Sequence, residues 1–193
     1  MQGVFDFLVS PKKERTTSKK IIDGKELILN TELQNHQYVS RNGIVVSVPK
    51  IGSTSIKAGD EVIIHHNVFR RFYDVRGAEK NSKSYFTEDL FFAQPDQIFA
   101  YKSNNVWMPV DGFYFVKPIK SMDMFSTSVE EPLKGIVKHG DENITQGSLV
   151  GFHPSSEYEF IIDGERLYRV PVNAITIKYE YQGNEEEYNP SWT

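Results

Sequence analysis

The sequence predicts an all-β fold made of two tandem small β-barrels with little helix, and three observations lead to this prediction. Short stretches rich in β-branched and aromatic residues recur between Gly, Pro, Asn and Asp residues, and helical periodicity is scarce. Similar strand and turn patterns occur twice, one after the other. Finally, 39% of the 193 residues are hydrophobic, which provides enough apolar side chains for two packed cores.

The candidate strands follow one another in chain order with turn residues between them. Each combines apolar alternation or a short apolar run with β-branched or aromatic side chains. They are VFDFLV (4–9), KELILNTEL (25–33), GIVVSVP (43–49), DEVIIHH (60–66), SYFTE (84–88), QIFAYK (97–102), GFYFVKPI (112–119), KGIVKHG (134–140), SLVGFH (148–153), YEFIID (158–163), RLYRV (166–170) and AITIKYEYQ (174–182).

A shared order of features predicts the tandem repeat. Gly43 and Gly135 each open a Gly-Ile-Val strand, which is followed by a polar loop and an Ile-x-x-Gly turn. The turn glycines are Gly59 and Gly147, where a residue without Cβ adopts positive φ at little cost. An aromatic strand pair, a corner and a closing strand then complete each unit. The corners contain Pro95 and Pro171.

The boundaries of the units follow from composition. The first unit carries a charged stretch, FRRFYDVRGAEKNSK, that the second lacks, and insertions of this kind map to surface loops. The polar segment KSNNVWMPVDG at 102–112 is the expected junction. We therefore expect an N-terminal arm at 1–23, a first barrel at 24–104 with an insertion near 69–83, a second barrel at 105–181 and an acidic C-terminal tail at 182–193.

Charge and composition disfavour several classes of partner. The chain has 22 basic and 26 acidic residues, and its net charge of -4 argues against nucleic-acid binding. The absence of cysteine excludes disulfides, thiolate zinc sites and thiol nucleophiles. No apolar run approaches the roughly 20 residues of a membrane-spanning helix, and no signal peptide is expected. A cytoplasmic protein without a membrane partner is the resulting expectation.

Motifs for catalysis, cofactors and metals are not found. The sequence contains no Gly-x-Ser-x-Gly, Gly-x-Gly-x-x-Gly or Walker pattern. His65 and His66 are adjacent in a predicted strand, so alternation should send them to opposite faces, where they cannot chelate one metal. We expect no catalytic, cofactor or metal site and no enzyme activity, although paired carboxylates of a glycosidase stay open because Asp and Glu are plentiful.

The stretch FRRFYDVR alternates basic and aromatic residues, as surfaces that bind single-stranded nucleic acids do. Asp74 and Glu79 lie close to it in the sequence, and the whole chain is acidic. This charge balance favours a loop that contacts protein over a surface that binds nucleic acid.

The second unit resembles the GroES-like co-chaperonin (chaperonin-10) family. GFYFVKPIKS is similar to the opening strand of the family, KGIVKHG to its Gly-x-Val strand, ITQGSLVGF to its turn and following strand, and YEFIIDGERLYRVPVNAITIKYE to its final strands. The resemblance covers about 112–180, and a looser one covers about 24–102. It implies a non-enzymatic β-barrel subunit of an oligomeric ring that contacts a chaperonin and assists protein folding.

The family binds chaperonin through a mobile loop between the opening strand and the Gly-Ile-Val strand. The corresponding stretches here are QNHQYVSR and SMDMFSTSVEEPL, and the second offers flexible apolar side chains of the kind used at adaptable binding surfaces. The candidate partner contacts are Met122, Met124, Phe125, Val129, Tyr38 and Val39.

Both candidate loops are short, and no roof hairpin follows either Gly-Ile-Val strand. The alternative is therefore a structural assembly protein, such as a viral particle component located in the virion, that reuses the same barrel. In either case VFDFLV and AITIKYEYQ are predicted to be edge strands that pair with neighbouring copies in a homo-oligomer, because uncovered apolar edges associate. The candidate edge residues are Val4, Phe5, Phe7, Ile175, Ile177 and Tyr179.

Overall fold

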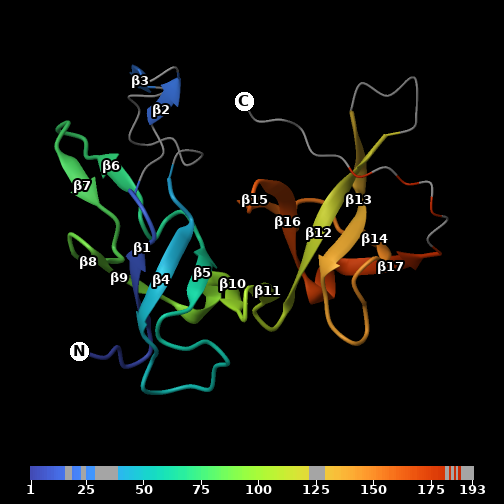
Figure 1. Ribbon diagram of the computed structural model, residues 1–193, viewed down its shortest axis with the longest axis horizontal. Coiled ribbons are helices and arrows are strands. Elements are labelled where there is room, and N and C mark those ends of the chain that lie inside the picture. Colours follow the sequence, from blue (N-terminus) through green and yellow to red (C-terminus); the bar gives the residue numbers. More distant parts are fainter. Residues whose placement is uncertain are drawn as a thin grey trace. The chain divides into compact units, whose positions relative to one another are not determined.

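The chain divides into two compact units, Met1–Met108 and Pro109–Thr193, and the division falls inside the expected junction. The computed structural model describes residues 1–15, 19–22, 25–28, 39–121 and 129–180, together with 183, 185 and 187 (Figure 1). These residues form strands and two short 3-10 helices, which confirms the all-β prediction. Each unit is described by itself below.

The first unit is built on a seven-stranded sheet with the order β11-β10-β5-β4-β1-β9-β8. Two hairpins, β2–β3 and β6–β7, and the 3-10 helix η2 accompany it. The sheet strands are β1 (Phe7–Pro11), β4 (Asn42–Ser47), β5 (Glu61–Ile64), β8 (Tyr85–Thr87), β9 (Leu90–Ala93), β10 (Ile98–Ser103) and β11 (Val106–Pro109). The other elements are β2 (Lys19–Ile22), β3 (Lys25–Ile28), β6 (Arg71–Tyr73), β7 (Glu79–Asn81) and η2 (Pro95–Gln97).

The second unit is built on a six-stranded sheet with the order β15-β16-β12-β13-β14-β17. All of its neighbouring strands are antiparallel. The elements are β12 (Phe113–Lys120), β13 (Glu130–His139), β14 (Leu149–Phe152), β15 (Tyr158–Ile162), β16 (Glu165–Pro171), η3 (Val172–Ala174) and β17 (Ile175–Tyr179).

The two sheets have the same strand order once β11 is set aside. Reading from the closing strand, β10-β5-β4-β1-β9-β8 corresponds to β17-β14-β13-β12-β16-β15. The register also agrees, since Pro11 lies opposite Gly43 in the first unit and Pro118 lies opposite Gly135 in the second. A β-bulge precedes Val9 in β1 and Val116 in β12, its counterpart. The duplication predicted from the sequence is therefore present in the fold.

This correspondence corrects the prediction of an N-terminal arm. β1 is the opening strand of the first unit, and it pairs with β4 on one side and β9 on the other. Its residues Phe7, Leu8 and Val9 are buried. The first unit therefore begins before residue 24, because the strand that fills the centre of its sheet comes from this segment.

The turn glycines have equivalent conformations in both units. Gly59 and Gly147 have φ of +93° and +87°, which side chains with a Cβ rarely adopt. Their amides donate to the carbonyl oxygens of Val45 and Val137, at 2.7 Å and 2.8 Å. Each turn therefore closes onto the Gly-Ile-Val strand of its own unit.

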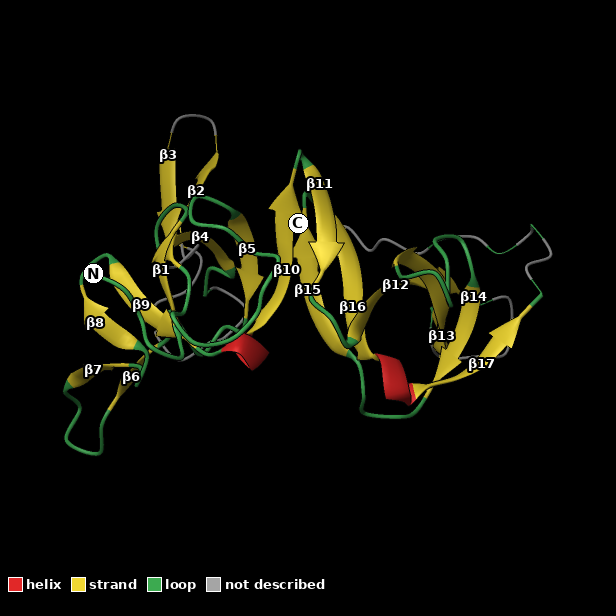
Figure 2. Cartoon of the chain, turned by 90° about the horizontal axis from the view of Figure 1, so that it is seen from below, coloured by secondary structure: helices red, strands yellow, loops and turns green. Residues whose placement is uncertain are grey.

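The proline-containing corners also match, and each begins a short 3-10 helix that leads into the closing strand. Pro95 begins η2, and Pro171 directly precedes η3 (Figure 2). The amide of His65, just after β5, donates to the carbonyl of Gln97 at 2.8 Å. The amide of His153, just after β14, donates to the carbonyl of Ala174 at 3.0 Å. In both units this bond ties the corner to the strand that pairs with the closing strand, which is β5 in the first unit and β14 in the second.

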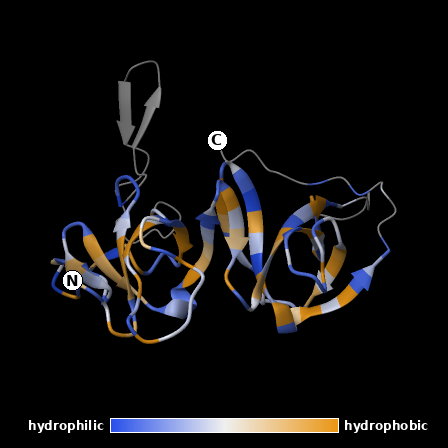
Figure 3. Ribbon diagram, turned by 60° about the horizontal axis from the view of Figure 1, so that its bottom comes forward, coloured by the Kyte–Doolittle hydropathy of each residue, from blue (hydrophilic) through white to orange (hydrophobic). Residues whose placement is uncertain are grey.

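A buried apolar core holds each sheet. In the second unit it includes Tyr114, Val116, Val137, Val150 and Val170, which lie on neighbouring strands. Hydrophobic residues, coloured orange in Figure 3, recur along the strands of both units. In the first unit the corresponding strands bury Phe7, Val9, Val45, Val62 and Ala93. Burial of one such valine or aromatic side chain contributes on the order of 2 kcal/mol, so the core contributes more than surface ion pairs do.

The closed barrels predicted from the sequence are not found in the described residues. The end strands β8 and β11 of the first sheet do not pair with each other there, and neither do β15 and β17 of the second. Each sheet is therefore an open one with two edges over the part of the chain that is described.

Candidate functional site

The connection between the opening strand and the Gly-Ile-Val strand differs between the units. In the second unit it runs from Ser121 to Val129, between β12 and β13. In the first unit it runs from residue 12 to residue 41, between β1 and β4, and it contains the β2–β3 hairpin. The stretch QNHQYVSR is thus only the end of a longer connection, because the opening strand lies much earlier than the sequence analysis placed it.

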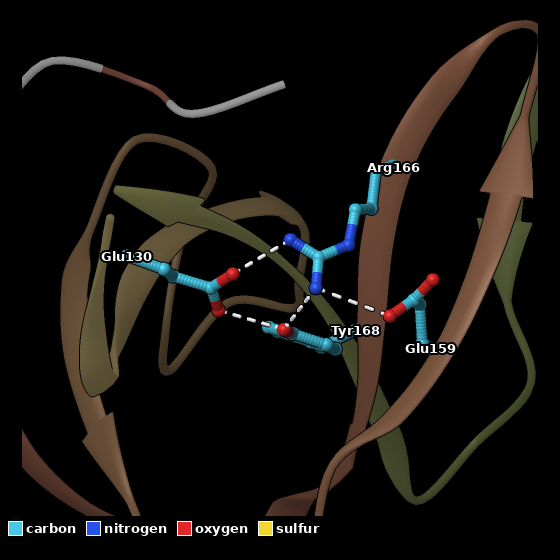
Figure 4. Close-up of polar contacts among 4 residues, drawn as sticks. All are labelled: Glu130, Glu159, Arg166 and Tyr168. Atoms are coloured by element: carbon cyan, nitrogen blue, oxygen red, sulfur yellow. Dashed lines mark hydrogen bonds and ion pairs between the residues drawn. The ribbon is translucent and has the colours of Figure 1, made fainter. Parts of the chain in front are cut away.

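A network of four side chains anchors the end of the second unit's connection (Figure 4). Glu130, the first residue of β13, accepts from Arg166 Nη1 at 2.6 Å through Oε2 and from the Tyr168 hydroxyl at 2.6 Å through Oε1. Arg166 Nη2 also donates to the Tyr168 hydroxyl at 2.6 Å and to Glu159 Oε2 at 3.1 Å. The strand that leaves the connection is thereby tied to the β15–β16 hairpin.

Two members of the network, Tyr168 and Arg166, have raised pKa values. Burial, followed by the hydrogen bond to Glu130, raises the pKa of Tyr168 above its usual value. Burial alone would lower the pKa of Arg166, but its hydrogen bonds to Glu130 and Glu159 outweigh this effect and raise it. A phenol and a guanidinium that keep their protons at neutral pH are poor general acids and bases, so the network suits anchoring better than proton transfer.

A hollow of about 300 Å³ lies beside this network. Its lining combines the carboxylates of Glu130 and Glu157 with the apolar side chains of Leu133 and Phe152 and part of the Tyr168 ring. The backbone at Leu133 has φ of +58°, in the left-handed region that non-glycine residues rarely occupy. The start of β13 is therefore irregular where it leaves the connection.

The residues predicted to contact a partner differ in their exposure. Val129 is exposed at the end of the connection, next to the anchored Glu130. Val39 is buried, which corrects its assignment as a contact, because a side chain packed inside the first unit cannot reach a partner. Met122, Met124, Phe125 and Tyr38 lie outside the described residues.

The N-terminal edge prediction is wrong for β1. Because β1 lies between β4 and β9, its backbone groups are paired within the chain on both sides, and Phe7 is buried. Val4 and Phe5 precede the strand and are exposed. They are surface apolar groups and not part of an edge strand.

The C-terminal edge prediction fits the position of β17, which is the last strand of its sheet. Ile177 is exposed on it, whereas Ile175 and Tyr179 are partly buried against the core. Its counterpart in the first unit, β10, is covered by β11. The described part of the second unit has no strand in that position, so β17 presents an edge that β10 does not.

The hairpin β6–β7 occupies the charged insertion of the first unit. Phe72, Tyr73 and Val75 are exposed on it. Its basic groups face acidic ones, with Arg71 3.1 Å from Glu79 and Lys80 3.9 Å from Asp74 between the charged atoms. The hairpin therefore presents aromatic groups beside paired charges.

The histidine prediction needs a correction. The rings of His65 and His66 are stacked, with centroids 4.3 Å apart, because both residues lie beyond the last residue of β5, where strand alternation no longer applies. Across the described residues, no group of three or more His, Asp or Glu side chains is placed to hold a metal ion.

The comparisons with known proteins give no relative: no family model matches the chain, and no curated protein sequence matches it. In the part of the chain that is described, no helix is long and apolar enough to cross a membrane.

The network around Arg166 has no contiguous sequence motif that would predict it. Glu130 and Arg166 are 36 residues apart, and only the strand order brings them together. The available signal was the two-residue spacing of Arg166 and Tyr168, which places both side chains on one face of a strand.

Proposed function

We propose that this chain is a non-enzymatic, co-chaperonin-like protein whose two units are divergent GroES-like barrels and whose loops bind other polypeptides. The supporting observation is the duplicated strand order with a connection at the same place in both units. The resemblance of the sequence to the GroES-like family assigns chaperonin binding to that connection. In this proposal the chain forms or joins a cytoplasmic ring that contacts a chaperonin.

The second unit's connection is the proposed contact. It ends at an exposed apolar residue, Val129, and is followed at once by Glu130, which hydrogen bonds from Arg166 and Tyr168 hold in place. An apolar loop on a fixed base loses less conformational entropy on binding than one on a loose base. The proposal includes Met122, Met124 and Phe125 as further apolar contacts in the same connection.

A non-enzymatic role is supported by the chemistry of the hollow beside the Arg166 network. Tyr168, which lines this hollow, and the neighbouring Arg166 both have raised pKa values and keep their protons at neutral pH. No histidine is among the described residues that line this hollow. The proposal therefore includes no bond-making step.

Retention on a chaperonin tests the proposal. The variant Val129→Asp should lose retention on an immobilised chaperonin in the presence of ATP, because a carboxylate cannot enter an apolar groove without a partner. The matched control is Val106→Asp in β11, since Val106 and Val129 are 55% and 58% exposed. Equal retention of both variants and the unaltered chain would exclude this loop as the contact, and no retention of the unaltered chain would exclude the proposed function.

The alternative proposal is a structural assembly protein, with the virion as its location in the viral case. The edge of β17, which no described strand covers, and the exposed Val4 and Phe5 favour it, because such groups stabilise permanent interfaces. Analysis of the native source distinguishes the two functions. A fixed ratio of this chain to the other proteins of a purified particle supports assembly, and a pool that copurifies with chaperonin supports the first proposal.

A further inference from the structure

A second buried guanidinium, that of Arg15, lies in the first unit just after β1. Arg15 is 9% exposed. Its Nη1 donates to Asn81 Oδ1 at 3.0 Å, and its Nη2 donates to the carbonyl oxygen of Phe69 at 3.1 Å. The guanidinium carbon lies 4.6 Å from the centre of the Phe91 ring. The protein groups that bind Arg15 directly are thus neutral.

The guanidinium group of Arg15 lies over the aromatic ring that corresponds to the ring beneath Arg166 in the other unit. Phe91 lies opposite Val9 and Tyr168 lies opposite Val116, so the two rings are equivalent in the duplicated sheet. Arg166 lies over the Tyr168 ring at 5.0 Å, much as Arg15 lies over Phe91. The two guanidinium groups come from different elements, Arg166 from β16 and Arg15 from the connection that follows β1. Each unit therefore places a guanidinium group over the aromatic ring at this equivalent position of its sheet.

The two cations differ in the charges around them. Arg166, 8% exposed, has two carboxylates within 3.1 Å. Among the described residues, Arg15 has no carboxylate within ion-pair distance. The Nε atoms of both arginines are buried without a hydrogen-bond partner in the part of the chain that is described, so the difference lies in the carboxylates. Burial of an arginine without an opposite charge is costly. Consistently, burial and then the positive charge of Arg71 lower the pKa of Arg15, whereas the pKa of Arg166 is raised.

A hollow of about 640 Å³ opens beside Arg15. The cations of its lining are Lys13, Arg15 and Arg71, and Ser10 adds a hydroxyl group. The lining also includes Glu14, Glu88 and Asp89. These three acids are exposed, so water solvates them, whereas the buried Arg15 is shielded from water. Of the charged groups named here, the guanidinium group of Arg15 is thus the one that is poorly solvated.

We propose that this hollow binds the carboxylate of an acidic side chain on a partner polypeptide, with Arg15 as the main contact. The bound carboxylate would supply to Arg15 what Glu130 and Glu159 supply to Arg166. Hydrogen bonds between a guanidinium and a carboxylate are among the strongest in proteins, and shielding from water strengthens them further. This inference rests on the proposed function, because it assumes that the ligand is a polypeptide.

The test follows the Nε–H signal of Arg15 in proton–nitrogen NMR spectra of the full chain, assigned through its loss in Arg15→Lys. The probes are the peptides acetyl-Gly-Glu-Gly-amide and acetyl-Gly-Gln-Gly-amide, which differ only in the carboxylate. Ionic strength is kept equal with sodium chloride. Inorganic phosphate is a third probe, because it offers oxyanions without a peptide.

We expect the glutamate peptide to shift the Arg15 signal to saturation and the glutamine peptide to leave it unchanged. Equal responses to the two peptides, or no response to either, would overturn the proposal. A response to phosphate without one to the glutamate peptide would also overturn it, because the ligand would then be a phosphate. If only this experiment fails while Val129→Asp loses chaperonin retention, the proposed function stands and the pocket does not.

A second variant provides the carboxylate from within the chain. Asn81→Asp places a negative charge next to Arg15 Nη1 with little change of shape. It should weaken binding of the glutamate peptide by about tenfold or more. Asn105→Asp, in an exposed turn, is the control with the same change of net charge. Unchanged affinity in Asn81→Asp would contradict the assignment of Arg15 as the main contact.

Discussion

The two units have the same strand order, but they differ in the strands, hairpins and charged groups that surround this shared sheet. The first unit covers its closing strand β10 with β11 and inserts the β6–β7 hairpin, and none of its described carboxylates pairs with Arg15. The second leaves β17 at an edge and neutralises Arg166 with two acids. The sheet therefore tolerates changes at its edges and loops, while its central strand pairs stay the same.

The aromatic residues inside the units differ in one consistent way. Tyr114 and Tyr168 in the second unit occupy the positions of Phe7 and Phe91 in the first. Both hydroxyl groups bind a carboxylate, Tyr114 that of Asp141 and Tyr168 that of Glu130. The second unit thus has hydroxyl–carboxylate hydrogen bonds at positions where the first has phenylalanine rings, which cannot form them.

The largest difference in stability between variants of the two units should come from substitution of the glycines that open the Gly-Ile-Val strands. A Cβ at Gly135 would overlap the carbonyl oxygen of Lys117 and lie 2.5 Å from Val116 Cγ1. At Gly43 the nearest atom, the carbonyl oxygen of Ser10, would be 3.3 Å away. Gly135→Ala should destabilise its unit by about 3 kcal/mol, and Gly43→Ala should cost about 1 kcal/mol.

Hydrogen exchange followed by mass spectrometry measures each unit separately in the full chain. In Gly135→Ala, exchange should accelerate in β12–β14 and stay unchanged in β4 and β5. Equal effects of the two substitutions would contradict the close approach of β12 and β13 at this glycine.

A smaller effect is expected from the charge network. Glu130→Gln removes the charge that binds both Arg166 and Tyr168, and hydrogen bonds to charged groups contribute about 2 kcal/mol. Glu159→Gln is the matched control, because its side chain is 39% exposed and its ion pair with Arg166 should contribute less than about 1 kcal/mol. Urea unfolding of the unaltered chain, Glu130→Gln and Glu159→Gln measures which substitution lowers the free energy of unfolding more. A larger loss in Glu159→Gln would show that Glu130 is not the anchor.

The tyrosines sharpen the comparison at alkaline pH. Burial, together with the hydrogen bond to Asp141, raises the pKa of Tyr114 to about 12. In the unfolded chain a tyrosine loses its proton near pH 10, so between about pH 10 and pH 12 the unfolded state binds fewer protons than the native state. The free energy of unfolding of the second unit should therefore fall with rising pH, by up to about 1.4 kcal/mol per pH unit for this group.

Thermal unfolding followed by circular dichroism between pH 9 and pH 12 checks this dependence in the unaltered chain and in Tyr114→Phe. The variant should lose stability less steeply, since its unit then has Phe at this position, as the first unit does at Phe7. Identical slopes in the two proteins would contradict the assignment.

Much of the fold follows from local patterns in the sequence. The Gly-Ile-Val strands, the turns at Gly59 and Gly147 and the corners at Pro95 and Pro171 recur in the same order, and the structure places them equivalently. Glycine with positive φ and proline with fixed φ restrict the backbone regardless of distant contacts. Such signals can be recognised without knowing what the strands pair with.

The features that were missed depend on distant contacts. The opening strand β1 was assigned to an arm because a long connection separates it from β4, although Val9-x-Pro11 matches Val116-x-Pro118. The two guanidinium sites were missed because their partners come from other strands and loops. Their sequence spacing has no fixed pattern, and only the folded sheet brings them to the equivalent aromatic rings.

Native mass spectrometry of the full chain, alone and mixed with a chaperonin and ATP, tests the central claim most directly. The account predicts an oligomer of the chain by itself and a further complex in which that oligomer and the chaperonin are both present. A chain that stays monomeric and forms no complex with chaperonin would contradict the claim that these two β units act by binding other polypeptides.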